Sequence, residues 1–137
     1  MFSIRRRPAK PEVNGAERQR SLLVLEDNVF QATDLADLLE AAGYRVLGPI
    51  RSVREAMRVL EVDRIDAALL DIKLGDDNSM RIAETLTKRS IPVLFVSGFP
   101  KPDSPTYENL AYLAKPYTDE QLLHSVAALL SANASRT

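Results

Sequence analysis

Five short runs of consecutive hydrophobic residues recur along the chain, and each is followed by a longer, more polar stretch. Apolar residues at every position, rather than at alternate ones, favour strands covered on both faces of a parallel sheet. The middle run lies in the stretch 67–74 and leads into a carboxylate, Asp71, which we expect at the carboxyl end of its strand. The other predicted strands cover residues 22–25, 44–48 (closed by the Gly48-Pro49 pair), 91–96 and 110–114.

Helical spacing of apolar residues predicts helices between these strands. The first helix begins at a capping residue, Asn28, and ends just before Gly43. Three prolines between residues 100 and 105 exclude a regular helix over that stretch. At most a short helix fits around residues 104–109, so the fourth helix is expected to be short or irregular. The last helix is expected to fray from Ser131 onward. The remaining helix starts are marked by two capping boxes and a turn, at residues 52–55, 118–121 and 75–78.

The alternation of strand and helix predicts an α/β fold, with right-handed crossovers around a parallel sheet that has helices on both faces. A chain of 137 residues suits a single domain of this kind. We expect the folded domain to cover residues 21–132, between a disordered basic N-terminal tail at 1–20 and a frayed C-terminus at 133–137.

Composition narrows the classes of function. The chain has no cysteine and one histidine, which excludes disulfides and thiolate metal sites and argues against a zinc cluster. It has no apolar run of membrane-helix length and no signal peptide, so we expect a soluble, cytoplasmic protein. Residues 1–20 carry six Lys or Arg against two acidic residues, but this signal is weak, and we predict no binding to nucleic acid or membrane.

Charged and hydroxyl side chains directly follow four of the five predicted strands. Parallel strands bring their carboxyl ends to one edge of a sheet, where ligands bind in such folds. We therefore expect these side chains to lie close together. They are Glu26 and Asp27 after the first strand, Asp71 after the third, Ser97 after the fourth and Lys115 after the fifth.

Three of these side chains are carboxylates, and two like charges at ~4 Å repel by roughly 4 kcal/mol at an effective dielectric of ~20. A bound cation removes this repulsion, and oxygen ligands favour a hard ion, here Mg²⁺. A carboxylate, a lysine and a hydroxyl beside such an ion predict phosphoryl chemistry. Asp71 would attack phosphorus, Lys115 would neutralise the transferred group, and Ser97 would donate a hydrogen bond to it.

Over residues 21–132 the chain resembles the receiver domain of two-component response regulators. The resemblance implies a flavodoxin-like (βα)5 fold, with a doubly wound sheet of five parallel strands in the order 2-1-3-4-5. The stretch around Ser97 also resembles the Phe-Ala-Thr-Gly-Tyr stretch of an alphaproteobacterial single-domain subgroup. The resemblance rests on four motifs in this order and spacing: the acidic pair Glu26-Asp27, the Leu-Leu-Asp71 strand end, Ser97-Gly98 and Lys115-Pro116.

This resemblance implies a role for each site residue. Asp71 would accept a phosphoryl group from a sensor histidine kinase or a histidine phosphotransfer protein. Tyr112 would act with Ser97 as a conformational switch, and the Lys115–Pro116 peptide bond would be cis. The implied ligands of Mg²⁺ are Glu26, Asp27, Asp71 and the backbone carbonyl of Lys73.

We therefore expect a stand-alone receiver, monomeric or weakly dimeric, that is loaded on Asp71 and then changes its binding to a downstream protein or drains phosphate from a kinase. It would catalyse its own phosphorylation and dephosphorylation but would not turn over an external substrate. One alternative is a degenerate receiver that acts only as a binding module. A second is a phosphatase with an aspartyl nucleophile, but such enzymes place a second acid where this chain has Lys73.

Overall fold

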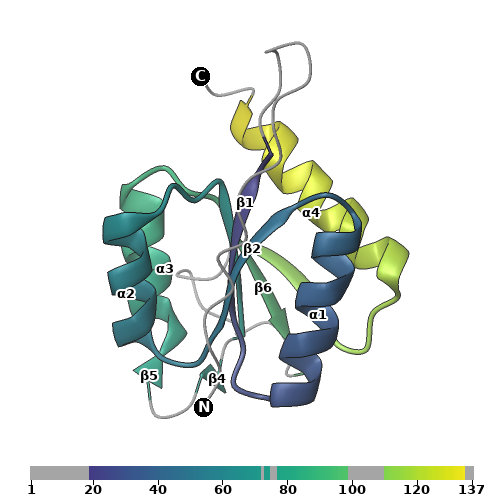
Figure 1. Cartoon of the computed structure of the whole chain (residues 1–137), viewed down its shortest axis with the longest axis horizontal. Helices are drawn as coiled ribbons and strands as arrows, with labels where there is room; N and C mark the ends of the chain where they lie inside the picture. Colours follow the sequence, from purple (N-terminus) through teal and green to yellow (C-terminus); the bar gives the residue numbers. More distant parts are fainter. Residues whose placement is uncertain (1–18, 72, 75–76, 99–109, 135–137) are drawn as a thin grey trace.

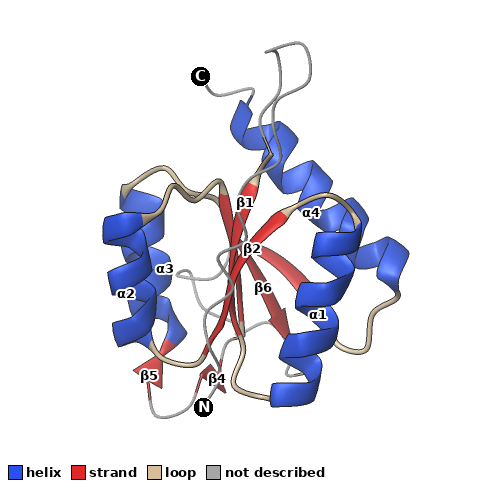
Figure 2. Cartoon of the chain, in the orientation of Figure 1, coloured by secondary structure: helices blue, strands red, loops and turns tan. Residues whose placement is uncertain are grey.

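The computed structural model describes residues 19–71, 73–74, 77–98 and 110–134 (Figure 1). Two helices cover each face of a central sheet (Figure 2): α1 (Val29–Ala41) and α4 (Asp119–Ala134) lie on one face, and α2 (Val53–Val62) and α3 (Ser79–Lys88) on the other. The predicted α/β fold and strand order are confirmed. The sheet is parallel, in the order β2 (Arg45–Ile50), β1 (Ser21–Leu25), β3 (Ala67–Leu70), β6 (Val93–Ser97), β7 (Ala111–Ala114).

Burial of both sheet faces explains the consecutive apolar residues of the strands. In β1, Leu23 and Leu25 pack on the side of α2 and α3, and Val24 packs on the side of α1 and α4. Burying each such side chain contributes ~1.5–3 kcal/mol to stability. Leu25 pairs with Leu70 of β3, which in turn pairs with Phe95 of β6. The core therefore holds the carboxyl ends of these three strands side by side.

The local signals for the first two helices are confirmed. Asn28 Oδ1 accepts a hydrogen bond from the Gln31 N–H at 3.0 Å, and Ser52 Oγ accepts one from the Glu55 N–H at 3.2 Å. Each bond satisfies a backbone donor that the first helical turn leaves without a partner. Gly43 follows α1 with a φ of 100°, a left-handed conformation that favours glycine.

The second strand is longer than predicted, because it continues through the Gly48-Pro49 pair to Ile50. The prediction that this pair ends the strand is wrong. Gly48 has a φ of 135°, and a Cβ atom there would lie 2.7 Å from the carbonyl oxygen of Val24. The register between β1 and β2 shifts at this place, and Ile50 O then accepts a hydrogen bond from the Glu26 N–H at 3.0 Å. Strand β2 is an edge strand, where a proline is tolerated.

The stretch after the central strand also differs from prediction. Strand β3 ends at Leu70, and the chain then forms a short strand β4 (Lys73–Leu74) that pairs antiparallel with β5 (Asp77–Asn78). Asp77 and Asn78 were predicted in a turn, and the strand pairing corrects this. Helix α4 runs to Ala134 instead of fraying from Ser131. Three predicted features lie outside the described residues. They are the basic tail (except residues 19–20), the fourth helix, and the first half of the turn, Gly75 and Asp76.

At the amino-terminal edge of the sheet, a buried carboxylate is hydrogen-bonded to the first residue of β1. Asp66 Oδ2 accepts a hydrogen bond from the Ser21 N–H at 2.7 Å, and the Asp66 N–H donates to the Ser21 carbonyl at 2.8 Å. Arg20 lies 3.9 Å from the same carboxylate. These contacts tie the start of β1 to the residue before β3. Among the helices that the structure describes, none is long and apolar enough to cross a membrane.

Candidate functional site

Three carboxyl groups gather at the carboxyl edge of the sheet. Glu26 and Asp27 directly follow β1, and Asp71 directly follows the neighbouring strand β3. One carboxylate oxygen from each of the three residues lies within 4.8 Å of the others. The pairing of β1 with β3 produces this arrangement, because it places the last residues of the two strands opposite each other. The structure therefore brings together the three acids that the sequence singled out.

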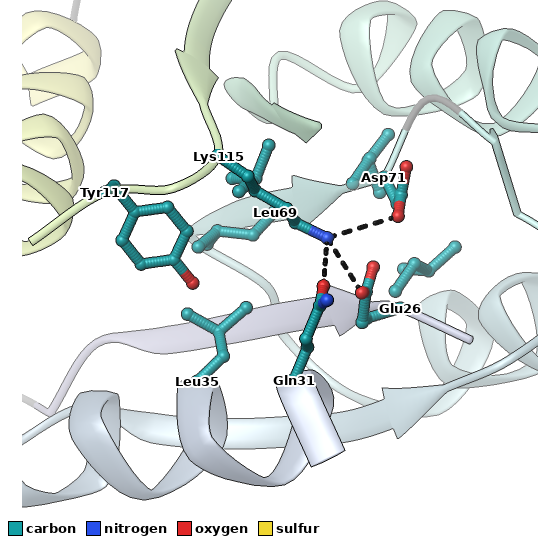
Figure 3. Close-up of a pocket in the computed structure, with 10 residues that line it drawn as sticks. Glu26, Gln31, Leu35, Leu69, Asp71, Lys115 and Tyr117 are labelled. Carbon is teal, nitrogen blue, oxygen red and sulfur yellow. Dashed lines mark hydrogen bonds and ion pairs between the residues drawn. The ribbon is translucent and has the colours of Figure 1, made fainter. Parts of the chain in front are cut away.

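Lys115 reaches into this cluster from the end of β7. Its Nζ atom donates to Glu26 Oε1 at 2.9 Å and lies 3.4 Å from Asp71 Oδ2 (Figure 3). The backbone N–H of Lys115 donates to the Ser97 carbonyl at 2.8 Å, which fixes this residue to the end of β6. The peptide bond to Pro116 is cis, as the family resemblance implies.

The two residues predicted to form a switch lie on neighbouring strands, β6 and β7. Ser97 is the last residue of β6 and is fully buried, and it pairs with Ala114 of β7. Tyr112, also in β7, pairs with Phe95 and packs against the core on the side of α2 and α3. Its hydroxyl oxygen is buried and has no hydrogen-bond partner among the described residues. The backbone of Lys73 lies in β4, two residues beyond Asp71.

Burial makes the charge on Glu26 unfavourable. This residue is only 4% exposed, and burial, together with the neighbouring Asp71 carboxyl, raises its pKa from 4.5 to about 7. The Lys115 ammonium opposes this rise but does not cancel it. Burial alone would lower the pKa of Lys115, but its hydrogen bond and charge attraction to Glu26, with a further attraction to Asp71, raise it overall. The lysine therefore stays charged, whereas Glu26 is only partly ionised near neutral pH.

The cluster fits a hard divalent cation. Lys115 supplies one positive charge against three carboxyl groups, and both burial and the neighbouring Asp71 carboxyl disfavour the charged form of Glu26. The donors are carboxylate oxygens, the ligands that Mg²⁺ prefers. Glu26, Asp27 and Asp71 could each supply one of them.

Sequence reasoning missed one residue of this site. Gln31, on the first turn of α1, accepts a hydrogen bond from Lys115 Nζ through Oε1 at 2.5 Å (Figure 3). Its spacing from Asn28 is that of a capping pair, and this local pattern does not reveal a contact with a residue 84 positions later.

Comparisons with known proteins agree with this geometry. The chain is 26% identical to the transcriptional regulatory protein PdtaR of Mycobacterium tuberculosis, over 82% of this chain and 57% of that protein. It is 28% identical to the polar-differentiation response regulator DivK of Brucella anthropi, over 81% of this chain and 96% of that protein. The solution structure of SdrG from Sphingomonas melonis Fr1 matches with a TM-score of 0.71 and 32% identity, over 82% of this chain and 97% of that one.

The chain spans about half the length of the curated relatives that match it first. PdtaR and DivK are both named as regulators, not as enzymes that turn over a substrate. The family model of the response regulator receiver domain matches residues 22–127, which is most of the described fold. The chain therefore belongs to the response regulator receiver domain family.

Proposed function

We propose that Asp71 accepts a phosphoryl group from a phosphohistidine on a sensor histidine kinase or a histidine phosphotransfer protein. The observation that carries this proposal is the meeting of three carboxyl groups and the Lys115 ammonium at one edge of the sheet. A carboxylate and an ammonium so placed supply the nucleophile and the positive charge that phosphoryl transfer needs.

In the proposed reaction, an Asp71 carboxylate oxygen attacks phosphorus as the bond between phosphorus and the donor imidazole nitrogen breaks. The electron pair of that bond stays on the leaving imidazole nitrogen, and an O–P bond forms on Asp71. Lys115, whose ammonium already lies 3.4 Å from Asp71 Oδ2, neutralises charge on the transferred oxygens. A Mg²⁺ ion held by Glu26, Asp27, Asp71 and the carbonyl of Lys73 would neutralise further charge on the phosphoryl group.

We propose that Ser97 and Tyr112 communicate the loaded state. Ser97 is buried at the strand end beside the site, where its hydroxyl could donate to a phosphoryl oxygen. Tyr112 has a buried hydroxyl without a partner among the described residues, and such a group is destabilising where it lies. A second position in which the hydroxyl finds a partner would offset part of this cost, which suits a two-state switch.

The loaded domain would act by changing its contacts with another protein or by draining phosphate from the kinase. The match to DivK supports this role, because it covers 96% of that protein and so shows that a response regulator of receiver length exists among the relatives. Histidine kinases consume ATP, so we propose that the reaction takes place in the cytoplasm.

The proposal is tested with a phosphorylated histidine kinase domain as the donor, in Mg²⁺ and in EDTA. Wild-type protein should take up acid-labile, base-labile label in Mg²⁺ and lose most of this uptake in EDTA. Asp71→Asn should take up none, whereas Asp37→Asn, a change to an exposed acid on α1, should be labelled like wild type. Label on Asp71→Asn would overturn the assignment. Wild type that takes up no label from this donor or from acetyl phosphate would indicate a binding module.

A further inference from the structure

The Gln31 side chain is diverted from its usual local partner. Gln31 is the third residue of a helix capped by Asn28, and at this position a glutamine side chain typically bonds back to the N–H of the capping residue. Helix α4 follows that pattern: the Thr118 N–H donates to Gln121 Oε1 at 2.9 Å, and the Gln121 N–H donates to Thr118 Oγ1 at 3.1 Å. In α1 only the backbone half of the pair forms, and Gln31 Oε1 instead accepts from Lys115 Nζ.

This contact completes the hydrogen bonding of the Lys115 ammonium. An ammonium has three N–H donors, and the structure gives Lys115 Nζ three acceptors. They lie at 2.5 Å (Gln31), 2.9 Å (Glu26) and 3.4 Å (Asp71). The ammonium is thus held closer to α1 than to Asp71. A phosphoryl oxygen that arrives on Asp71 can be contacted only if one of the present acceptors is given up.

Gln31 is the acceptor whose release is easiest. Glu26 is buried, so water cannot readily take the place of the ammonium at its carboxyl oxygen. Gln31 is neutral and exposed, so water can replace the ammonium at its Oε1 atom. Asp71 carries the phosphoryl group itself in the proposed function.

We propose that Gln31 is a positioning residue that holds the Lys115 ammonium toward α1 in the unloaded site and releases it when a phosphoryl group reaches Asp71. The identity of residue 31 then sets how readily the site is loaded. This inference rests on the proposed phosphoryl acceptance by Asp71.

The test replaces Gln31 in two opposite ways and measures loading from acetyl phosphate with Mg²⁺. Gln31→Met keeps the length of the side chain but removes the acceptor, so it should load about 3- to 10-fold faster, the factor that corresponds to one net hydrogen bond. Gln31→Glu supplies a charged acceptor that holds the ammonium more tightly, so it should load at least about 10-fold more slowly. The backbone bond to Asn28 survives in both variants, so their melting temperatures should stay within about 2 °C of wild type.

The matched control is Gln19→Met. It makes the same chemical change at the opposite edge of the sheet, where it removes the hydrogen bond from Gln19 Nε2 to the Gly43 carbonyl. It should load at the wild-type rate. Loading of Gln31→Met at or below the wild-type rate, or loss of loading in both Gln31 variants alike, would overturn the proposal.

A second measurement separates this inference from the proposed function. In the unloaded, Mg²⁺-free protein, the ¹H–¹⁵N signal of the Lys115 ammonium reports how well its protons are held. Gln31→Met should speed proton exchange with water several-fold, and Gln31→Glu should slow it. Equal exchange in wild type and Gln31→Met would refute the role of Gln31 even if Asp71 is phosphorylated. If instead wild type is never labelled but the ammonium responds as expected, the proposed function fails and the positioning contact stands.

Discussion

Replacing Glu26 with glutamine should stabilise the protein in the absence of a metal ion, and by an amount that depends on pH. The carboxyl group is buried next to Asp71, and its pKa rises from 4.5 to about 7. Between these two values the unfolded chain releases the proton while the folded protein keeps it. The stability associated with this group is therefore fully present below the unfolded pKa and is lost as pH rises through the folded pKa. A glutamine, like a protonated glutamate, does not suffer this loss.

The size of the effect follows from the shift in pKa. Near pH 8 both the folded and the unfolded wild type have largely lost the proton, so the rise of the pKa from 4.5 to about 7 corresponds to about 3 kcal/mol. Near pH 5 the folded protein still holds the proton, and the same relation gives a stability difference between variant and wild type of less than about 1 kcal/mol. The amide oxygen of the Glu26→Gln variant can still accept a hydrogen bond from Lys115, which preserves the contact at 2.9 Å.

Urea denaturation in EDTA near pH 5 and near pH 8 measures this difference. The Glu26→Gln variant should gain about 3 kcal/mol over wild type at the higher pH and little at the lower one. Mg²⁺ should raise the stability of wild type but not that of the variant, because one ligand is lost. Glu61→Gln, at an exposed acid on α2, should show no such pH dependence. If the Glu26→Gln variant is no more stable than wild type near pH 8, burial of the ionised Glu26 carboxylate does not cost the folded protein the free energy derived above.

Two further predictions concern the framework that holds the site. Gly48→Ala should destabilise the protein by about 2 kcal/mol or more in urea denaturation. The φ of Gly48 is 135°, and the added Cβ would lie 2.7 Å from the Val24 carbonyl oxygen. An unchanged denaturation midpoint would show that this close approach is relaxed in solution. Asp66→Ala should lower the free energy of unfolding by about 1–3 kcal/mol, because it leaves the buried Ser21 N–H without this acceptor. Asp37→Ala, on the surface of α1, should change the free energy of unfolding little. Equal losses in both variants would refute the role of the Asp66 hydrogen bond.

The fold was readable from the sequence because both sheet faces are buried. Consecutive apolar residues such as Leu22–Leu25 fit a central parallel strand and are unusual on a half-exposed one. The second strand was cut short because Gly48-Pro49 normally marks a turn. Its continuation depends on the edge position of β2 and on the close approach of β1. Both are features of the tertiary structure that the local sequence does not reveal. The hairpin of β4 and β5 has two residues per strand, too few for a periodic signal.

The candidate site was predictable for a different reason. Residues at strand ends reach a common edge once the sheet is parallel, so Glu26, Asp71 and Lys115 could be placed together from their positions alone. Gln31 could not, because it comes from a helix, and its contact depends on how α1 is rotated against the sheet. The 4% exposure of Glu26 and the pKa of about 7 that results from it also depend on packing across the whole site.

The arrangement around Lys115 links the metal site to the phosphoryl site. The ammonium is shared between Glu26, a ligand in the proposed metal site, and Asp71, the proposed phosphoacceptor. A cation on Glu26 would repel the ammonium and weaken that contact. The contact to Gln31, at 2.5 Å, does not involve a proposed metal ligand and is not weakened in this way. It follows that the effect of residue 31 on loading should grow, rather than vanish, as Mg²⁺ saturates the carboxylates, since the competing attraction of Glu26 has then been reduced.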